Sequence, residues 1–248
     1  MSNLNKISTV DDDLLLANCS NEALLDMQEA AQEVLFWQSV LLKTNDGVVS
    51  EFLRDVEEVY HDQFYPADTV EDKETGCQYY FHAHSDRPEE YGHFHTYVME
   101  AGIPDNLHAI KPASMGSPND QYRTHCHLVA IGIENDGTPT SMFTLNHWSA
   151  HEAKYSLESL EQILDCFDIS HAVPSYPVNR WISALLRLYR PKIIDLFVQR
   201  EDALEGLARQ QPDVPPEANQ AMDVTSKIDI AIEAFALEVQ QEVARRAL

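Results

Sequence analysis

Hydrophobic residues recur at helical spacing in both terminal parts of this 248-residue chain. From Asn21 onward, apolar residues recur at helical spacing, with Gln38 as the one polar position in the stripe. This pattern predicts a long amphipathic helix. The turn at 45–47 ends this helix, and a second amphipathic stretch continues to Tyr60. Helical spacing returns beyond residue 151, in segments over 157–167, from Pro177 to a break at Pro191, over 193–208, and along a last stripe of Ile228, Ile232, Phe235, Val239 and Val243.

The middle of the chain instead alternates between apolar and polar residues, with the period of two that is typical of β-strands. Two hairpins are predicted: the first joins 78–84 to 93–99, and the second joins 122–133 to 139–148. The acidic segment 61–76 predicts a connector before them.

We therefore expect an α+β fold, with a small antiparallel sheet of about four strands covered by N- and C-terminal helices. One domain over 21–248 would follow a flexible acidic tail over 1–20. Within that domain the expected parts are helices over 21–60, a β core over 77–148 and helices over 151–248. The long connector 101–121 is either a lid over the β core or a plain crossover between the hairpins.

Histidines are concentrated in the β region, where nine of the eleven lie within residues 82–151. Three His-x-His pairs stand out: His82 and His84, His93 and His95, and His125 and His127. Because a strand projects alternate side chains to one face, each pair points both imidazoles in the same direction.

In the first hairpin, a loop over 85–92 would place His84 opposite His93 and His82 opposite His95. All four histidines then share one face of the sheet with Tyr80 and Tyr97.

The second hairpin allows two registers. A two-residue turn at 136–137 would place His127 opposite Asn146. A three-residue loop with Gly137 in the left-handed conformation would place His125 opposite His147. The hydrophobic pattern favours the second register, because it gathers Val129, Ile131, Phe143 and Leu145 on one face and turns Cys126 away from the histidines.

Neutral imidazole is the commonest metal ligand in proteins, so the histidine face predicts a metal site. The expected ligands are His93, His95, His125 and His127, followed by His82 and His84. So many histidines exceed one coordination sphere, which leaves a mononuclear and a dinuclear centre open. A set without sulfur favours Fe or Zn, with Mn, Cu and Ni as alternatives. The competing interpretation is a metal-free network of imidazoles.

Other residues near these pairs suggest chemistry around an ion. Arg87 and Arg123 each lie beside a histidine pair, where they would clamp a carboxylate or phosphate, or form a salt bridge to one of the 41 acidic residues. Tyr97 and Glu90 are the candidates for general acid or base. Carboxylate ligands could come from Glu89, Glu90, Glu100 or Glu152.

Two local resemblances add to these expectations. His93-Phe-His95 followed by Glu100 resembles the His-x-His-x4-Glu element of the cupins, which implies a metal-centred β-barrel; the flanking helices leave too little strand for that barrel. Residues 79–155 look similar to a bacterial domain-of-unknown-function family. The segments that carry this likeness are 87–95, 127–131 and 143–148, and the family implies one continuous functional core without naming a reaction.

The net charge of −24 argues against nucleic acid or an anionic membrane as partner. No apolar run approaches the ~20 residues that span a bilayer. The N-terminus shows no secretory signal, and four widely spaced cysteines predict reduced thiols, so we expect a cytoplasmic protein. The sequence makes no prediction about the oligomeric state.

The function hypothesis is a metal-dependent enzyme that acts on a small molecule, by oxygen activation or metal-assisted hydrolysis. The alternatives are a non-catalytic metal-binding or sensing protein and a structural domain with a metal-free histidine network.

Overall fold

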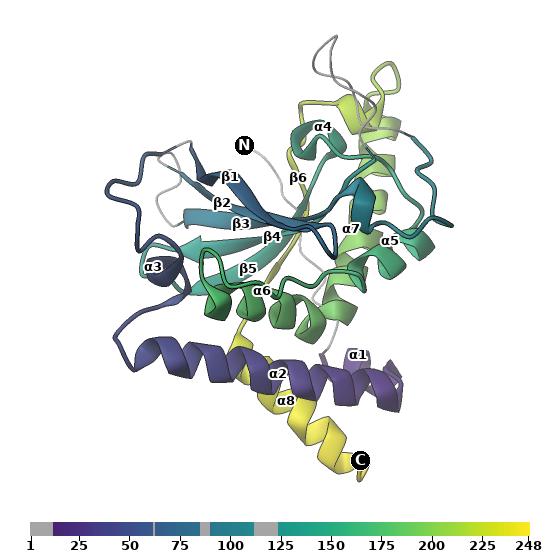
Figure 1. Cartoon of the computed structure of the whole chain (residues 1–248). Coiled ribbons are helices and arrows are strands. Elements are labelled where there is room, and N and C mark those ends of the chain that lie inside the picture. Colours follow the sequence, from purple (N-terminus) through teal and green to yellow (C-terminus); the bar gives the residue numbers. More distant parts are fainter. Residues whose placement is uncertain (1–11, 62, 85–89, 112–123) are drawn as a thin grey trace.

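The computed structural model describes residues 12–61, 63–84, 90–111 and 124–248, and it shows an α+β fold. Six antiparallel strands follow one another in chain order across an open sheet (Figure 1). They are β1 (Phe64–Asp72), β2 (Cys77–Ala83), β3 (Glu90–Val98), β4 (Cys126–Glu134), β5 (Pro139–Leu145) and β6 (Val224–Asp229).

Helices come from both ends of the chain, as the apolar stripes predict. The N-terminal helices are α1 (Asp12–Asn18), α2 (Asn21–Leu42) and α3 (Val48–Phe52), and the later ones are α4 (His147–Ala150), α5 (Leu157–Leu164), α6 (Tyr176–Leu188), α7 (Arg190–Gln210) and α8 (Ile232–Arg245). Ser20 caps α2 by accepting a hydrogen bond from the backbone N–H of Ala23 at 3.1 Å. In the part of the chain that the structure describes, no helix is long and apolar enough to cross a bilayer.

The core lies between one face of the sheet and the helices. Figure 1 shows α6 next to the sheet, with α2 and α8 beyond it. Tyr79, Phe81 and Phe94 point from β2 and β3 into this core, where they contact Phe52. The Tyr79 hydroxyl donates to Asn179 of α6 at 2.6 Å, which satisfies a buried polar atom. Residues on the opposite face of β2 and β3 are therefore directed away from the helices.

Two strands lie where the sequence predicts none, which is why the sheet has six strands and not about four. β1 occupies the expected connector 61–76, and its pairing with β2 is irregular between Tyr65 and Val70. A strand with proline is tolerated at an edge, because its outer side needs no partner. β6 includes Ile228, which we assigned to the last helical stripe; that helix begins at Ile232.

The N-terminal part also differs from expectation. The described residues of the predicted tail include the helix α1, whose Leu16 is buried. The second amphipathic stretch is helical only over α3, and the chain turns after Phe52. Burial of Leu16, hydrogen bonds from Arg246 to the carbonyls of Leu16 and Ala17, and the ion pair of Asp12 with Lys192 hold this short helix against the rest of the molecule.

The first hairpin keeps the predicted face but shifts by two residues. His82 lies opposite His93, and Tyr80 lies opposite His95. The expected pairs, His84 with His93 and His82 with His95, are therefore wrong. A shift of two leaves every side chain on its face, so the shared histidine face is confirmed.

The second hairpin has the predicted loop but the other register. Gly137 adopts the left-handed conformation, with φ of 86°. An irregularity between Gly132 and Ile133 then moves the pairing by one residue, so Ala130 lies opposite Phe143. Our preferred register, with His125 opposite His147, is wrong because a β-bulge inverts the faces beyond it. Ile131 and Met142 consequently face the helices, and Phe143 faces the histidine side.

Candidate functional site

The candidate site lies on the sheet face directed away from the helices. β2 supplies His82 and β3 supplies His93 and His95, with His82 directly opposite His93. His93 and His95 are 4 % and 5 % exposed, whereas His82 is half-buried. The strand period fixes these positions, because residues two apart on one strand share a face.

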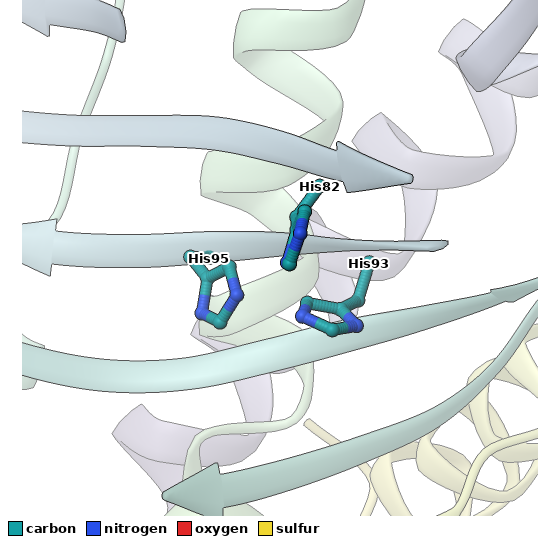
Figure 2. Close-up of side chains that lie close together, drawn as sticks. All are labelled: His82, His93 and His95. Carbon is teal, nitrogen blue, oxygen red and sulfur yellow. The ribbon is translucent and has the colours of Figure 1, made fainter. Parts of the chain in front are cut away.

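Two groups of potential metal ligands form on this face. In the first, one ring nitrogen from each of His82, His93 and His95 lies within 4.8 Å of the others. Figure 2 shows these three imidazoles gathered over two neighbouring strands. In the second, a ring nitrogen of His84, a ring nitrogen of His93 and a carboxylate oxygen of Glu90 lie within the same limit. His93 therefore belongs to both groups.

Glu90 is tied directly to His93. Its Oε1 lies 2.7 Å from Nδ1 of His93, which is a short hydrogen bond. With the proton on Nδ1, the other nitrogen of His93 keeps its lone pair for a metal ion. A carboxylate behind a histidine in this way fixes the orientation of the ring and increases its basicity.

His127 lies next to the first group and contacts it through His95. Its Nε2 lies 3.2 Å from Nδ1 of His95, within hydrogen-bond distance. An irregularity in the β3–β4 pairing between His95 and Tyr97 brings His127 opposite Tyr97, so that it reaches His95. Burial holds the pKa of His127 well below its usual range, with a smaller contribution from His95, so His127 is neutral.

Two tyrosines flank the histidines. The hydroxyls of Tyr80 and Tyr97 lie 3.2 Å apart, and the Tyr80 ring lies 4.8 Å from that of His95. Burial raises the pKa of both phenols, so both stay protonated at neutral pH. On the other side, the Phe143 ring lies 5.2 Å from that of His93 and forms an apolar boundary.

A buried charged cluster that we did not predict from the sequence lies behind His127. Arg200 of α7 donates to Oε1 of Glu152 at 2.9 Å, and both residues are 1 % exposed. Oε2 of Glu152 accepts from the backbone N–H of His127 at 2.9 Å. His147 Nδ1 lies 3.3 Å from Oε1 of Glu152. A signal was present, because Arg200 falls on the apolar stripe of α7, where a charge needs a buried partner.

Burial dominates the acid–base behaviour of this cluster. It raises the pKa of Glu152 to about 7, although Arg200 acts in the opposite direction. Burial and then the charge of Arg200 lower the pKa of His147 to about 2. Glu152 is thus committed to Arg200 and to the backbone of β4, and is not a ligand in either histidine group.

The remaining predicted residues are distributed more widely. His125 is 7 % exposed, and its ring lies 5.8 Å from that of Tyr97; neither it nor His127 belongs to the two ligand groups. Glu100 is exposed in a short 3-10 turn, Glu100–Gly102, and the open sheet does not support the cupin resemblance.

His147 and His151 are on and next to α4, where His147 is buried and His151 is exposed. Arg87, Glu89, Arg123 and residues 112–121 of the expected lid lie outside the described residues.

The sequence of the chain matches a known protein family. A family model described as "Domain of unknown function (DUF6969)" matches residues 28–230. The chain belongs to this family. The DUF6969 match extends well beyond the residues 79–155 that carry the resemblance and includes every residue of the two ligand groups. No curated protein and no solved structure matches.

Proposed function

We propose that this DUF6969 protein is a metal-dependent enzyme whose ion is held by His82, His93 and His95. The observation that carries the proposal is that three imidazole nitrogens, from two adjacent strands, lie within 4.8 Å of one another. Strands hold such ligands more rigidly than loops do. Fe or Zn suits this nitrogen set best, and Mn, Cu and Ni stay possible.

Three protein ligands on one face leave coordination positions for water or substrate, which is the arrangement of catalytic metal sites. An ion there would supply Lewis-acid or redox chemistry to a small molecule, in hydrolysis or in oxygen activation. Tyr97 is the first candidate for general acid or base, and burial keeps its hydroxyl protonated at neutral pH. Glu90 holds His93 by its hydrogen bond, and it is the second candidate for proton transfer. Arg87 and Arg123 keep their proposed role of binding an anionic group of the substrate.

A second candidate function is metal binding without catalysis. It is favoured by the burial of His93 and His95, which are 4 % and 5 % exposed. A fully occupied coordination sphere would block access of a substrate. The metal-free network is favoured by the contact between His95 and His127.

Elemental analysis of protein purified without a histidine tag tests the proposal. We expect stoichiometric metal in the wild type and none in a His93→Ala/His95→Ala variant. A His61→Ala/His108→Ala variant, which removes two exposed histidines outside both groups, is the matched control and should keep the metal. Absence of metal from the wild type after reconstitution with Fe(II) or Zn(II) would refute the enzyme and binding proposals together.

Oxygen uptake or hydrolysis of model esters by the loaded protein then separates catalysis from binding. A loaded wild type that shows neither activity, and whose ion accepts no added ligand such as azide, would favour the non-catalytic function.

A further inference from the structure

The two ligand groups share His93 but differ in chemistry. The first group offers three nitrogens, whereas the second offers two nitrogens and a carboxylate oxygen. The second set has the composition of the two-histidine, one-carboxylate sites that hold iron. The rings are packed closely enough for both sets to be used: the His93 ring lies 4.3 Å from that of His95 and 4.7 Å from that of His84.

The two ring nitrogens of His93 face different groups of potential ligands. Nδ1 is the atom 2.7 Å from Glu90, which assigns it to the group of His84 and Glu90. Figure 2 shows one ring nitrogen of His93 pointing toward His95 and the other pointing away from it. The imidazole is therefore oriented so that each nitrogen faces one group.

We propose that His84, Glu90 and His93 form a second cation position, and that His93 bridges it to the ion on His82, His93 and His95. The inference rests on the proposed function, because that function supplies the first ion. The second ion would replace the proton shared by His93 and Glu90. That proton leaves to solvent, and His93 becomes an imidazolate with one nitrogen on each ion.

The charges support this exchange. A divalent ion held by three neutral imidazoles keeps its full charge, and it favours loss of a proton from a ring that it already coordinates. Glu90 and the imidazolate then bring two negative charges to the second ion, while His84 adds a neutral donor. The first position has no anionic protein ligand of its own. The carboxylate of Glu90 in the second position therefore compensates part of the positive charge of the two ions.

Zinc stoichiometry after equilibrium dialysis tests the proposal through single variants. We expect two zinc ions per chain in the wild type. His84→Ala and Glu90→Ala should each keep only the first ion, and His82→Ala should keep only the second. His93→Ala should lose both, which is the signature of a shared ligand. His61→Ala and Glu100→Gln, at exposed positions outside both groups, should keep both ions.

Each variant is first checked for a wild-type circular dichroism spectrum and urea midpoint, so that loss of zinc is not loss of fold. Copper titration followed by electron paramagnetic resonance gives an independent readout. Two Cu(II) ions bridged by imidazolate couple, so the integrated signal per ion should fall as the second equivalent binds.

The outcomes separate this inference from the function on which it rests. No zinc in the wild type would overturn both. One zinc that persists in His84→Ala and Glu90→Ala but disappears in His82→Ala would keep the metal-dependent function and overturn the second position. One zinc that disappears in Glu90→Ala would overturn it too, since Glu90 would then only support the first ion. Two copper ions with the full, uncoupled signal would overturn the bridge.

Discussion

Two clusters of polar side chains lie close together in this molecule, and they are built in different ways. The histidine cluster, made of His82, His84, Glu90, His93 and His95, draws on two neighbouring strands and is half-exposed at three of its five members. The ion-pair cluster, made of His147, Glu152 and Arg200, joins α4, the following loop and α7, and it is almost completely buried. His127 contacts both, through its ring on one side and its backbone on the other.

The two clusters differ in the free energy that burying their side chains costs. Imidazole is a weak base that can stay uncharged when it is buried, so several histidines can be grouped on one face of a sheet without an unpaired charge. A buried carboxylate and guanidinium depend on each other, because either one alone would be an unpaired charge in the interior. The second cluster therefore holds α7 and the loop after α4 against β4, whereas the first does not depend on one ion pair.

The largest effect that we predict breaks the ion-pair cluster. Arg200→Met should lower the free energy of unfolding by about 3–5 kcal/mol, because it leaves Glu152 buried without its partner. Urea unfolding measures this change. The matched Glu152→Gln/Arg200→Met variant should recover part of the loss. If Arg200→Met were no less stable than His93→Ala, the contrast between the two clusters would be wrong.

Gly92→Ala should disturb the backbone beneath the histidine cluster. Gly92 is buried in β3, and an added Cβ would overlap the carbonyl oxygen of His82 and the ring of Phe81. We expect a loss of about 1–3 kcal/mol in unfolding free energy, together with weaker metal binding, because the strands carrying His82 and His93 must move apart. Gly206→Ala in α7 is the control, with open space around it, and should stabilise by about 0.5–1 kcal/mol. Equal behaviour of the two variants would contradict the prediction.

The buried histidines behind the histidine face should make the free energy of unfolding depend on pH. His147 has a pKa of about 2 in the folded protein and 6.5 in the unfolded chain, so the unfolded chain binds more protons below pH 6.5. Its contribution is complete above that pH and is lost as the pH falls. Between pH 7 and 5, the wild type should lose about 2 kcal/mol more than His147→Gln.

Two further groups act in the same window. His127 has its pKa lowered as well and adds to the acid loss. Glu152, raised to about 7, acts in the opposite direction, because the folded state holds its proton more tightly than the unfolded chain does. Parallel pH profiles of the wild type and His147→Gln would remove His147 as a cause.

The smallest effect is expected at Glu100. This carboxylate would be a ligand in a cupin-like site, but it is exposed beyond the end of β3. Glu100→Gln should change the free energy of unfolding by less than about 0.5 kcal/mol. Isothermal titration with zinc should give the same affinity as the wild type. A clear loss of affinity would restore Glu100 as a ligand.

The histidine face could be predicted from sequence because it depends only on the period of a strand. The residues that lie opposite one another on neighbouring strands could not be predicted. A shift of two residues in the first hairpin changed which histidines are opposite each other while leaving their face intact. In the second hairpin, the predicted loop at Gly137 formed, and one irregularity beside Gly132 still inverted the faces.

The pairing of Glu152 with Arg200 could not be predicted from sequence for a different reason. Glu152 and Arg200 are 48 residues apart, on a loop and a helix whose packing no local pattern specifies. β1 and β6 were missed because edge strands need not alternate clearly or lack proline, and their pairing comes from the neighbouring strand. Local periodicity thus revealed the histidine face, and tertiary packing decided its surroundings.

The order of the strands along the chain also has a consequence for synthesis. β1 to β5 pair in sequence, whereas β6 joins the sheet only after α4 to α7, with Ile228 opposite Met142 of β5. A ribosome therefore releases β2 and β3, with most of the histidine cluster, long before the last strand exists. Domains generally fold as units, and a single hairpin is only marginally stable in water. The histidine-bearing hairpin of the nascent chain therefore has no complete core to pack against until α6 and β6 have been made.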